Sequence, residues 1–207
     1  MRAKLLLADD HSITLEGMRS VIGREHDLVG EVRDGRALVA EALRLRPDLI
    51  VLDIGMPLLN GIEATRQIRR AWPRAKLLFV SMHSNGLYVR EAMNAGASGY
   101  ILKTSAAEEL LPAIRAVLEG QVYMSPALGP NVIPAAPARR ETPGLTERQR
   151  EVLQLIAEGH SSKEVASILG ISIKTANFHR YEVKKKLGVH SIAELAAFAA
   201  RSGLVSE

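Results

Sequence analysis

Four of the apolar runs in this chain end in polar side chains that could carry out chemistry together. One run ends at Asp53, and the others end at Asp9 with Asp10, at Ser81 and at Lys103. Carboxylates are the ligands that Mg2+ prefers, while a lysine and a hydroxyl can stabilise charge on a phosphoryl group. If these groups meet at one place, Asp53 can be the nucleophile of a phosphoryl transfer and become an acyl phosphate.

The elements that would position these groups are strands alternating with helices. Short apolar runs alternate with segments such as 13–22 and 62–71, whose apolar residues follow a helical period. This alternation predicts a parallel sheet covered by helices on both faces, and ligands of such sheets bind beyond the carboxyl ends of the strands. The polar groups lie at those ends. The expected strands are 5–8, 28–32, 49–52, 77–80 and 99–102.

Three carboxylates at one end of a sheet repel one another unless a cation neutralises them, so we expect Mg2+ among them. Each residue alone also has a structural interpretation, with Asp9 and Asp10 as helix caps, Asp53 as a turn residue and Lys103 as a solvated loop charge. Suitable groups at four strand ends favour the phosphoryl-transfer interpretation over these alternatives.

Beyond residue 120 the sequence changes character. The segment from Gln121 to Pro143 holds five prolines and has no period, which predicts a semi-extended linker. From Leu145 onward the segments have helical periodicity, with capping residues before them and glycines after them. The expected domains are 1–120 and 144–207, joined by a linker over 121–143. The expected helices of the second domain are 147–158, 162–169, 173–187 and 192–202, with N-caps at Thr146, Ser161, Ser172 and Ser191 and stops at Gly159, Gly170, Gly188 and Gly203.

The helix expected over 173–187 concentrates the positive charge of the chain. Residues 174–186 hold five Lys and Arg against one Glu, whereas the charges of residues 1–120 nearly balance. Apolar residues share one helical face, and cations, an amide and two aromatic rings share the other. With the preceding helix this predicts a helix-turn-helix that enters the major groove of DNA; a solvated charged face is the alternative. The inward residues are Ala176, Val183 and Leu187, and the outward ones are Lys174, Asn177, Phe178, Tyr181, Lys184 and Lys185.

Composition limits the class of protein. The chain has 207 residues, a net charge of +4 and no cysteine, which excludes disulfides and thiolate chemistry. No apolar run approaches the roughly 20 residues of a membrane span, and the first residues pass directly into a strand pattern. We therefore expect a cytoplasmic protein that does not contact a membrane.

Residues 1 to about 120 resemble the receiver domain of bacterial two-component response regulators. The resemblance rests on Leu7 to His11, on Asp53 to Pro57, on Ser81 and on Lys103. It implies a flavodoxin-like, doubly wound, five-stranded parallel sheet that a sensor histidine kinase phosphorylates. It implies no enzymatic activity beyond Mg2+-dependent self-phosphorylation and autodephosphorylation. The implied phosphoacceptor is Asp53, and Ser81 and Lys103 assist the phosphoryl transfer. The implied metal ligands are Asp10 as the principal ligand, Asp9, Asp53 and the Gly55 carbonyl. The implied switch residues are Ser81 and Tyr100.

Two positions depart from the usual receiver pattern. Met82 stands where many receivers have a small residue, and we expect it to narrow access to Asp53. Thr104 stands where a proline is common, which removes the usual reason for a cis peptide bond. Neither change removes the groups that the chemistry needs.

Residues 145–187 are similar to the LuxR-type DNA-binding domain, a small all-α, four-helix, helix-turn-helix fold. The matching pattern includes Gly159, Ser161, Leu169 and Thr175, but Ala176 replaces a bulkier aliphatic residue. The whole chain thus resembles a NarL/FixJ-type response regulator, which implies double-stranded DNA as a partner and a homodimer on activation. The implied DNA contacts are Lys174, Thr175, Asn177, Phe178, His179, Arg180, Tyr181, Lys184 and Lys185, and the implied dimer stripe is Ile192, Leu195, Ala196 and Ala199.

The sequence leaves two other functions open. A constitutive DNA-binding regulator could use a receiver for protein contacts alone. A phosphatase with an aspartyl-phosphate intermediate commonly has a second carboxylate two residues after the nucleophile, and Gly55 stands at that position here.

Overall fold

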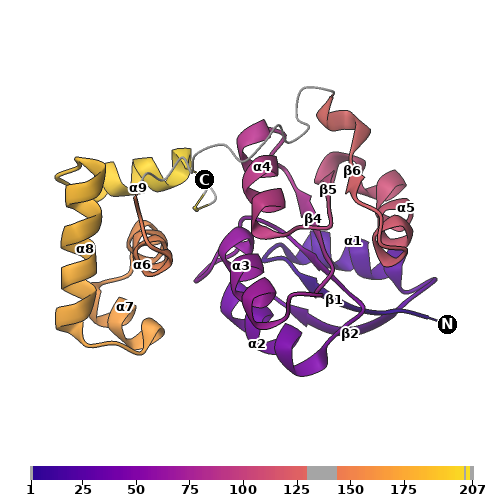
Figure 1. Cartoon of the computed structure of the whole chain (residues 1–207), viewed down its shortest axis with the longest axis horizontal. Helices are drawn as coiled ribbons and strands as arrows, with labels where there is room; N and C mark the ends of the chain where they lie inside the picture. Colours follow the sequence, from indigo (N-terminus) through magenta and orange to yellow (C-terminus); the bar gives the residue numbers. More distant parts are fainter. Residues whose placement is uncertain (1, 130–143, 203, 206–207) are drawn as a thin grey trace.

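The computed structural model describes residues 2–129, 144–202 and 204–205. They form an α/β domain and a smaller helical domain that lie side by side (Figure 1). We call them the receiver and the effector. No helix in the described part of the chain is long and apolar enough to cross a membrane.

The receiver is built on a parallel sheet with the strand order β2-β1-β3-β4-β5-β6. This order is that of a doubly wound flavodoxin-like sheet extended by one strand. The five predicted strands are present, and a sixth strand adds to the edge. The strands are β1 (Lys4–Ala8), β2 (Asp27–Val32), β3 (Leu49–Leu52), β4 (Leu77–Ser81), β5 (Gly99–Leu102) and β6 (Tyr123–Met124).

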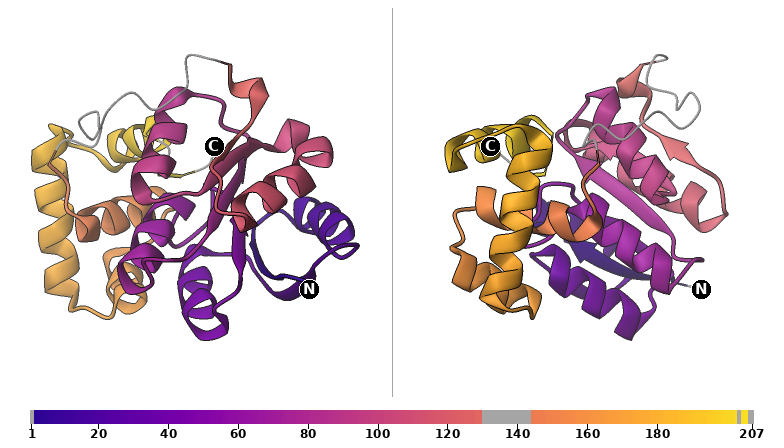
Figure 2. Two further views of the ribbon diagram at one scale, coloured as in Figure 1. Left: turned by 45° about the vertical axis from the view of Figure 1, so that its right-hand side comes forward. Right: turned by 60° about the vertical axis from the view of Figure 1, so that its left-hand side comes forward.

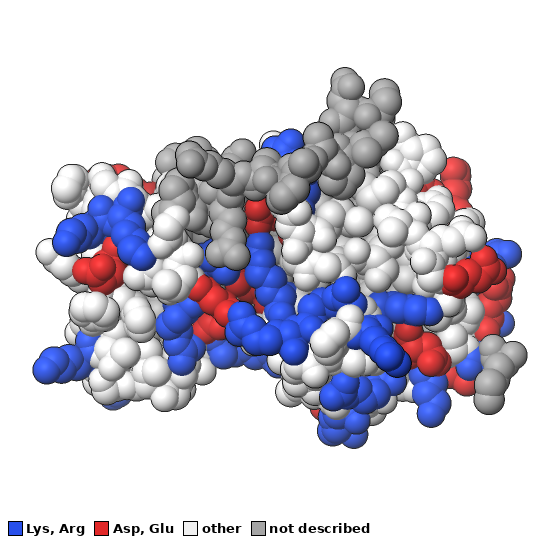
Figure 3. Space-filling view, viewed as in Figure 1, with Lys and Arg blue, Asp and Glu red and all other residues white. Residues whose placement is uncertain are grey.

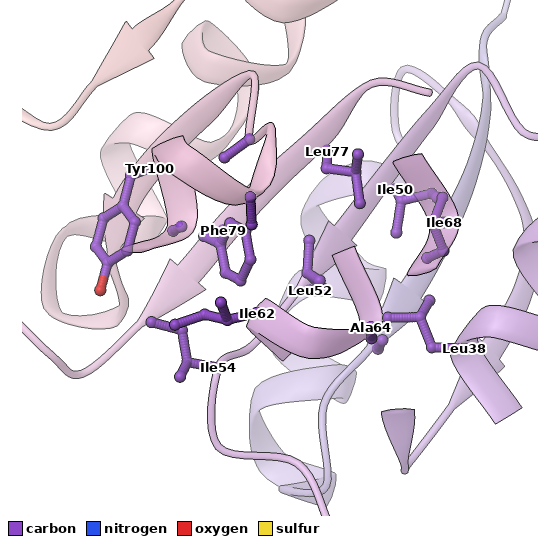
Figure 4. Packing of buried hydrophobic residues seen from close by; sticks show 14 of the residues in the cluster. Leu38, Ile50, Leu52, Ile54, Ile62, Ala64, Ile68, Leu77, Phe79 and Tyr100 are labelled. Carbon is purple, nitrogen blue, oxygen red and sulfur yellow. The ribbon is translucent and has the colours of Figure 1, made fainter. Parts of the chain in front are cut away.

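Helices cover both faces of the sheet because side chains of successive strand residues point to opposite faces. Leu6, Ile50 and Phe79 pack against α2 (Gly35–Leu45), α3 (Gly61–Ala71) and α4 (Gly86–Ala95). Leu7 and Val51 pack under α1 (Ser12–Ile22) and α5 (Ala106–Leu118). Figure 4 shows Ile62, Ala64 and Ile68 of α3 lying over the β3 and β4 side chains. A 3-10 turn, η1 (Lys103–Ser105), precedes α5.

The first residues of the predicted linker form regular structure beside the receiver sheet. Tyr123 and Met124 of β6 pair with Gly99 and Tyr100 of β5, and a 3-10 turn, η2 (Pro126–Leu128), follows. Leu128 reaches the receiver core. A strand of two residues carries too little pattern to be recognised in sequence. Residues 130–143 and the expected stop at Gly203 lie outside the described residues, so the domain boundaries stay a prediction.

The effector consists of four helices near the predicted bounds: α6 (Glu147–Ala157), α7 (Ser162–Leu169), α8 (Ile173–Leu187) and α9 (Ile192–Arg201). The predicted N-caps at Thr146 and Ser161 are formed, and each is a capping box, with Gln149 and Glu164 as the respective partners. Gly170 and Gly188 take the left-handed conformation that ends α7 and α8, with φ of 62° and 67°. These local signals set where each helix begins and ends.

Candidate functional site and DNA-binding surface

The polar groups at the strand ends meet in one buried pocket. The Nζ atom of Lys103, just after β5, lies 2.7 Å from Oδ2 of Asp53 and 2.7 Å from Oδ2 of Asp9. It donates a hydrogen bond to Asp53, whereas Asp9 Oδ2 makes an ionic contact without hydrogen-bond geometry. Asp9, Asp53 and Ser81 are buried, and Asp10 is half-buried. The structure thus brings these five predicted residues to the carboxyl ends of β1, β3, β4 and β5.

Burial and neighbouring charges have opposite effects on the pKa values of Asp9 and Lys103 in this pocket. Burial raises the pKa of Asp9, although Lys103 and the His11 backbone N–H partly offset the effect. Burial alone would lower the pKa of Lys103, but the carboxylates of Asp53 and Asp9 outweigh it and raise this pKa above its ordinary value. Lys103 is therefore held as a cation between two carboxylates.

Local backbone packing fixes the Asp53 carboxylate. The Ile54 N–H donates to Asp53 Oδ1 at 2.6 Å, while Lys103 holds Oδ2. The start of α3 lies directly behind, because a Cβ at Gly61 would come within 2.0 Å of the Asp53 carbonyl oxygen. Asp53 thus cannot shift without moving α3.

Ser81 and Tyr100 are joined through the backbone of His83. The His83 N–H donates to Ser81 Oγ at 3.3 Å, and the Tyr100 hydroxyl donates to the His83 carbonyl at 2.6 Å. Tyr100 is fully buried beside Phe79, and burial raises the pKa of its hydroxyl. The predicted switch pair is therefore physically connected, with Tyr100 turned inward.

The carboxylates form a donor set that fits a divalent cation. One ligand atom from each of Asp9, Asp10, His11 and Asp53 lies within 4.8 Å of the others. Asp9 Oδ2 and Asp10 Oδ1 are buried oxygens without hydrogen-bond geometry to a donor, and each carboxylate oxygen has two lone pairs that can bind a metal ion. Sequence reasoning missed His11, whose Nδ1 lies 2.7 Å from Asp10 Oδ1. Its position directly after the two aspartates was the available signal.

A cavity of about 540 Å³ opens over Asp53. Its walls include Gly55, Lys103 and the exposed side chain of Met82. Narrowing of access to Asp53 by Met82 stays a prediction. Residues of the effector, Ala200 and Val205, complete the lining. This shared wall could not be anticipated from either domain alone.

The outward face of α8 is solvent-exposed, and its inward face is buried. Ala176 and Val183 lie in the effector core, while the Phe178 and Tyr181 side chains are 57% and 63% exposed. Large exposed aromatic rings among cations are unusual on a surface without a binding role. Lys174, Asn177 and Lys185 are exposed on the same helix, while Thr175, His179, Arg180 and Lys184 are partly buried.

The predicted dimer stripe on α9 divides into two parts. Leu195 and Ala199 are fully buried in the core of their own effector domain, against α6. Ile192 is 49% exposed and Ala196 is partly exposed. Any contact through this helix would therefore use the second pair, and the dimer role of the stripe stays a prediction.

Both halves match known protein families. Residues 5–115 match the response regulator receiver domain, and residues 143–199 match the bacterial regulatory proteins of the luxR family. The chain is a LuxR-family response regulator. The receiver and DNA-binding interpretations are thereby confirmed, and the protein is a DNA-binding regulator of a two-component system.

Relatives of this response regulator share its complete two-domain arrangement. It is 35% identical to the transcriptional regulatory protein MctR of Rhizobium johnstonii, covering 100% of this chain and 97% of that protein. It is 34% identical to the response regulator protein VraR of Staphylococcus aureus, covering 99% and 100%. A solved structure of RcsB from Salmonella enterica serovar Typhimurium, bound to promoter P1flhDC with the phosphomimetic BeF3-, matches at 27% identity and a TM-score of 0.61, with 100% of both chains covered.

The two domains of this response regulator dock through polar residues of α6. Arg150 makes a two-pronged ion pair with Glu63 of α3, with N–O distances of 2.6 and 3.1 Å, and both side chains are buried. Gln67 and Arg70 of α3 contact Glu151 and Glu147. Figure 3 shows acidic and basic side chains meeting where the domains adjoin, and Figure 2 shows α6 next to the receiver from two further directions.

Sequence reasoning missed this docking surface. Arg150, Gln154 and Glu158 recur at intervals of four residues and thus share one face of α6. A polar stripe of that kind normally indicates a solvated face. Here it is buried because the receiver packs against it.

Proposed function

We propose that a sensor histidine kinase phosphorylates Asp53 and that phosphorylation controls dimerisation and DNA binding. The observation that carries this proposal is the Lys103 ammonium held between Asp53 and Asp9 beside metal-binding oxygens. Such an arrangement offsets negative charge where a phosphoryl group would sit.

In this mechanism an oxygen of Asp53 attacks phosphorus as the bond from phosphorus to the donor nitrogen breaks. The Ile54 N–H and Lys103 orient the carboxylate, and Lys103 balances charge on the phosphoryl oxygens. Mg2+ would be held mainly by Asp10, together with Asp9, Asp53 and the Gly55 carbonyl. When bound, it would neutralise further negative charge on the phosphoryl oxygens.

The switch step uses groups that are already connected to one another. Movement of the Ser81 hydroxyl toward a phosphoryl group would pull on His83, whose carbonyl binds Tyr100. The effector then binds double-stranded DNA as a homodimer, with Lys174, Arg180 and Lys184 on phosphates and Asn177, Phe178 and Tyr181 at bases. Thr175, His179 and Lys185 lie near the DNA backbone, and Ile192 and Ala196 form the exposed part of the dimer contact. A regulator that takes phosphate from a kinase and binds the chromosome acts in the cytoplasm.

The test is Mg2+-dependent labelling of the purified protein with a small phosphodonor such as phosphoramidate. We expect one phosphoryl group per chain in the wild type and none in Asp53→Asn, which keeps the shape of the side chain. Labelling that survives in Asp53→Asn would place the phosphoacceptor elsewhere. No labelling of the wild type would leave a constitutive regulator.

A further inference from the structure

His11 places an imidazole nitrogen against the carboxylates of the pocket. Its Nδ1 lies 2.7 Å from Oδ1 of Asp10 and 3.1 Å from Oδ1 of Asp9. One ligand atom from each of these three residues and from Asp53 lies within 4.8 Å of the others. Two atoms that bind one ion at about 2.1 Å lie at most about 4.2 Å apart. The four side chains can thus bind a single ion after small movements.

Helix capping does not explain the position of this ring. His11 is the N-cap residue of α1, but its side chain makes no capping hydrogen bond. The His11 backbone N–H instead donates to Asp9 Oδ1 at 2.9 Å, and this local turn brings the ring to the carboxylates. The position of the side chain therefore has to be explained by the pocket.

The imidazole and the lysine contact different oxygens of the carboxylates. Lys103 lies against Oδ2 of Asp9, whereas His11 lies against Oδ1 of the same side chain. His11 also lines the cavity of about 540 Å³ over Asp53. Because a water molecule takes about 30 Å³, this volume has room for an ion, its waters and a phosphoryl group. A metal ion beside His11 therefore does not require Lys103 to leave.

A second histidine of the cavity takes no part in this cluster. His83 lines the same cavity, but its ring stacks on Tyr88 with the ring centres 4.1 Å apart. In the described part of the chain, His11 is the one histidine among the clustered ligands. A nitrogen ligand at this site would thus come from His11.

A nitrogen ligand changes which metal ion a site prefers. Mg2+ is a hard cation that takes oxygen ligands, whereas imidazole suits divalent transition ions such as Co2+, Ni2+ and Zn2+. A neutral imidazole binds an ion through one nitrogen and keeps its hydrogen on the other. The His11 side chain is 59% exposed, so water can accept that hydrogen bond while Nδ1 binds the ion.

We propose that His11 is a ligand of the metal ion at Asp9, Asp10 and Asp53, and that its nitrogen shifts the preference of the site from Mg2+ toward divalent transition ions such as Ni2+. This inference deepens the proposed function, on which it rests for the role of the ion in phosphoryl transfer. Metal binding itself can be measured without phosphorylation.

The first test measures the affinities of the full chain for Ni2+ and for Mg2+ by titration calorimetry. The variant is His11→Asn, because asparagine is a preferred N-cap residue and offers an oxygen in place of the imidazole nitrogen. Loss of a group that only orients a ligand already costs about 10- to 100-fold in metal affinity. We therefore expect His11→Asn to bind Ni2+ at least about tenfold more weakly, with a clearly smaller loss for Mg2+.

Two further variants locate the effect. His190→Ala removes an exposed histidine outside the receiver and should leave both affinities as in the wild type. Asp10→Asn removes a carboxylate of the cluster and should weaken the binding of both ions. A difference between Ni2+ and Mg2+ that appears with His11 alone is what a nitrogen ligand requires.

The second test detects the nitrogen itself. Mn2+ is the probe, because its unpaired electrons report a directly bound nitrogen nucleus in pulsed electron paramagnetic resonance. We expect the coupling of one imidazole nitrogen in the wild type and none in His11→Asn. In labelling with phosphoramidate, Ni2+ should be effective at a lower concentration than Mg2+ in the wild type, and His11→Asn should lose this difference.

Mn2+ bound without a nitrogen coupling, or equal Ni2+ affinity of the wild type and His11→Asn, would overturn the inference. Labelling of Asp53 with Mg2+ would in that case still support the proposed function. If the wild type were labelled with neither Mg2+ nor Ni2+, the proposed function would fail, and with it the role of the ion in phosphoryl transfer.

Discussion

Gly61 shows how closely a single residue controls the candidate site. Its missing Cβ allows the first turn of α3 to pack against the Asp53 carbonyl, which a Cβ would approach to 2.0 Å, and the neighbouring atoms are backbone that cannot rotate away. The position of Asp53, the proposed phosphoacceptor, therefore depends on a residue without chemical function.

We predict that Gly61→Ala lowers the free energy of unfolding of the receiver by about 1 to 3 kcal/mol, the usual cost of overpacking. It should also slow labelling of Asp53. The control is Gly17→Ala on the exposed side of α1, where a Cβ meets nothing within 4 Å and better helix propensity should stabilise by about 0.5 to 1 kcal/mol. Fluorescence of the single tryptophan, Trp72, follows receiver unfolding in urea. Equal stability of the two variants would contradict the packing argument.

At the scale of one element, α8 has one face that packs in the effector core and an opposite face that is exposed and is expected to contact DNA. Ser172 caps its first turn and Gly188 ends it, and Ala176 and Val183 fix its rotation against the effector core. The exposed face is thereby presented as a whole, so its contacts to DNA are expected to divide into phosphate and base contacts.

We predict that Lys174→Ala with Lys185→Ala weakens binding to all DNA sequences. Each lost phosphate contact should reduce the slope of log affinity against log salt by about 0.9. Fluorescence anisotropy with specific and random duplexes at several salt concentrations measures this. Arg24→Ala, at an exposed site after α1 of the receiver, removes a charge without touching α8 and should leave the slope unchanged. A slope that is insensitive to the α8 lysines would exclude phosphate contacts by them.

At the scale of the whole molecule, Glu158 makes docking sensitive to pH. Burial raises the pKa of its carboxyl above the ordinary 4.5, although Gln154 and the Leu58 N–H partly offset this. Between the ordinary and the raised pKa the docked state binds more protons than the separated or unfolded state. The contribution of Glu158 to stability is therefore lost as the pH rises through this window.

We predict that Glu158→Gln, which stays neutral, gains stability relative to the wild type as the pH rises from 4.5. Below that value both side chains are neutral and the difference should vanish. Because His160 lies 3.6 Å from Glu158, both proteins should carry His160→Gln. Urea unfolding of the receiver, followed by Trp72, reports docking since the docked effector stabilises the folded receiver. A difference that shrinks with rising pH would show that Glu158 is not destabilised by burial.

The sequence by itself determined the local elements and the chemistry at their ends. Strand positions followed from apolar runs of about four residues, and the effector helices followed from caps such as Thr146 and Ser161, because these signals act within a few residues of the chain. Parallel strands bring their carboxyl ends to one edge, so the meeting of Asp9, Asp53 and Lys103 was predictable from alternation alone.

Only the tertiary structure decided which contacts form between elements that are far apart in the sequence. The strand β6, the burial of Leu195 and the partnership of Arg150 with Glu63 depend on contacts between residues far apart in sequence. A polar stripe on a helix has the same sequence pattern whether it faces water or packs against polar groups of another domain. The Asp53 pocket, Lys103 included, could thus be located from sequence, whereas the effector residues that complete its wall required both domains in place.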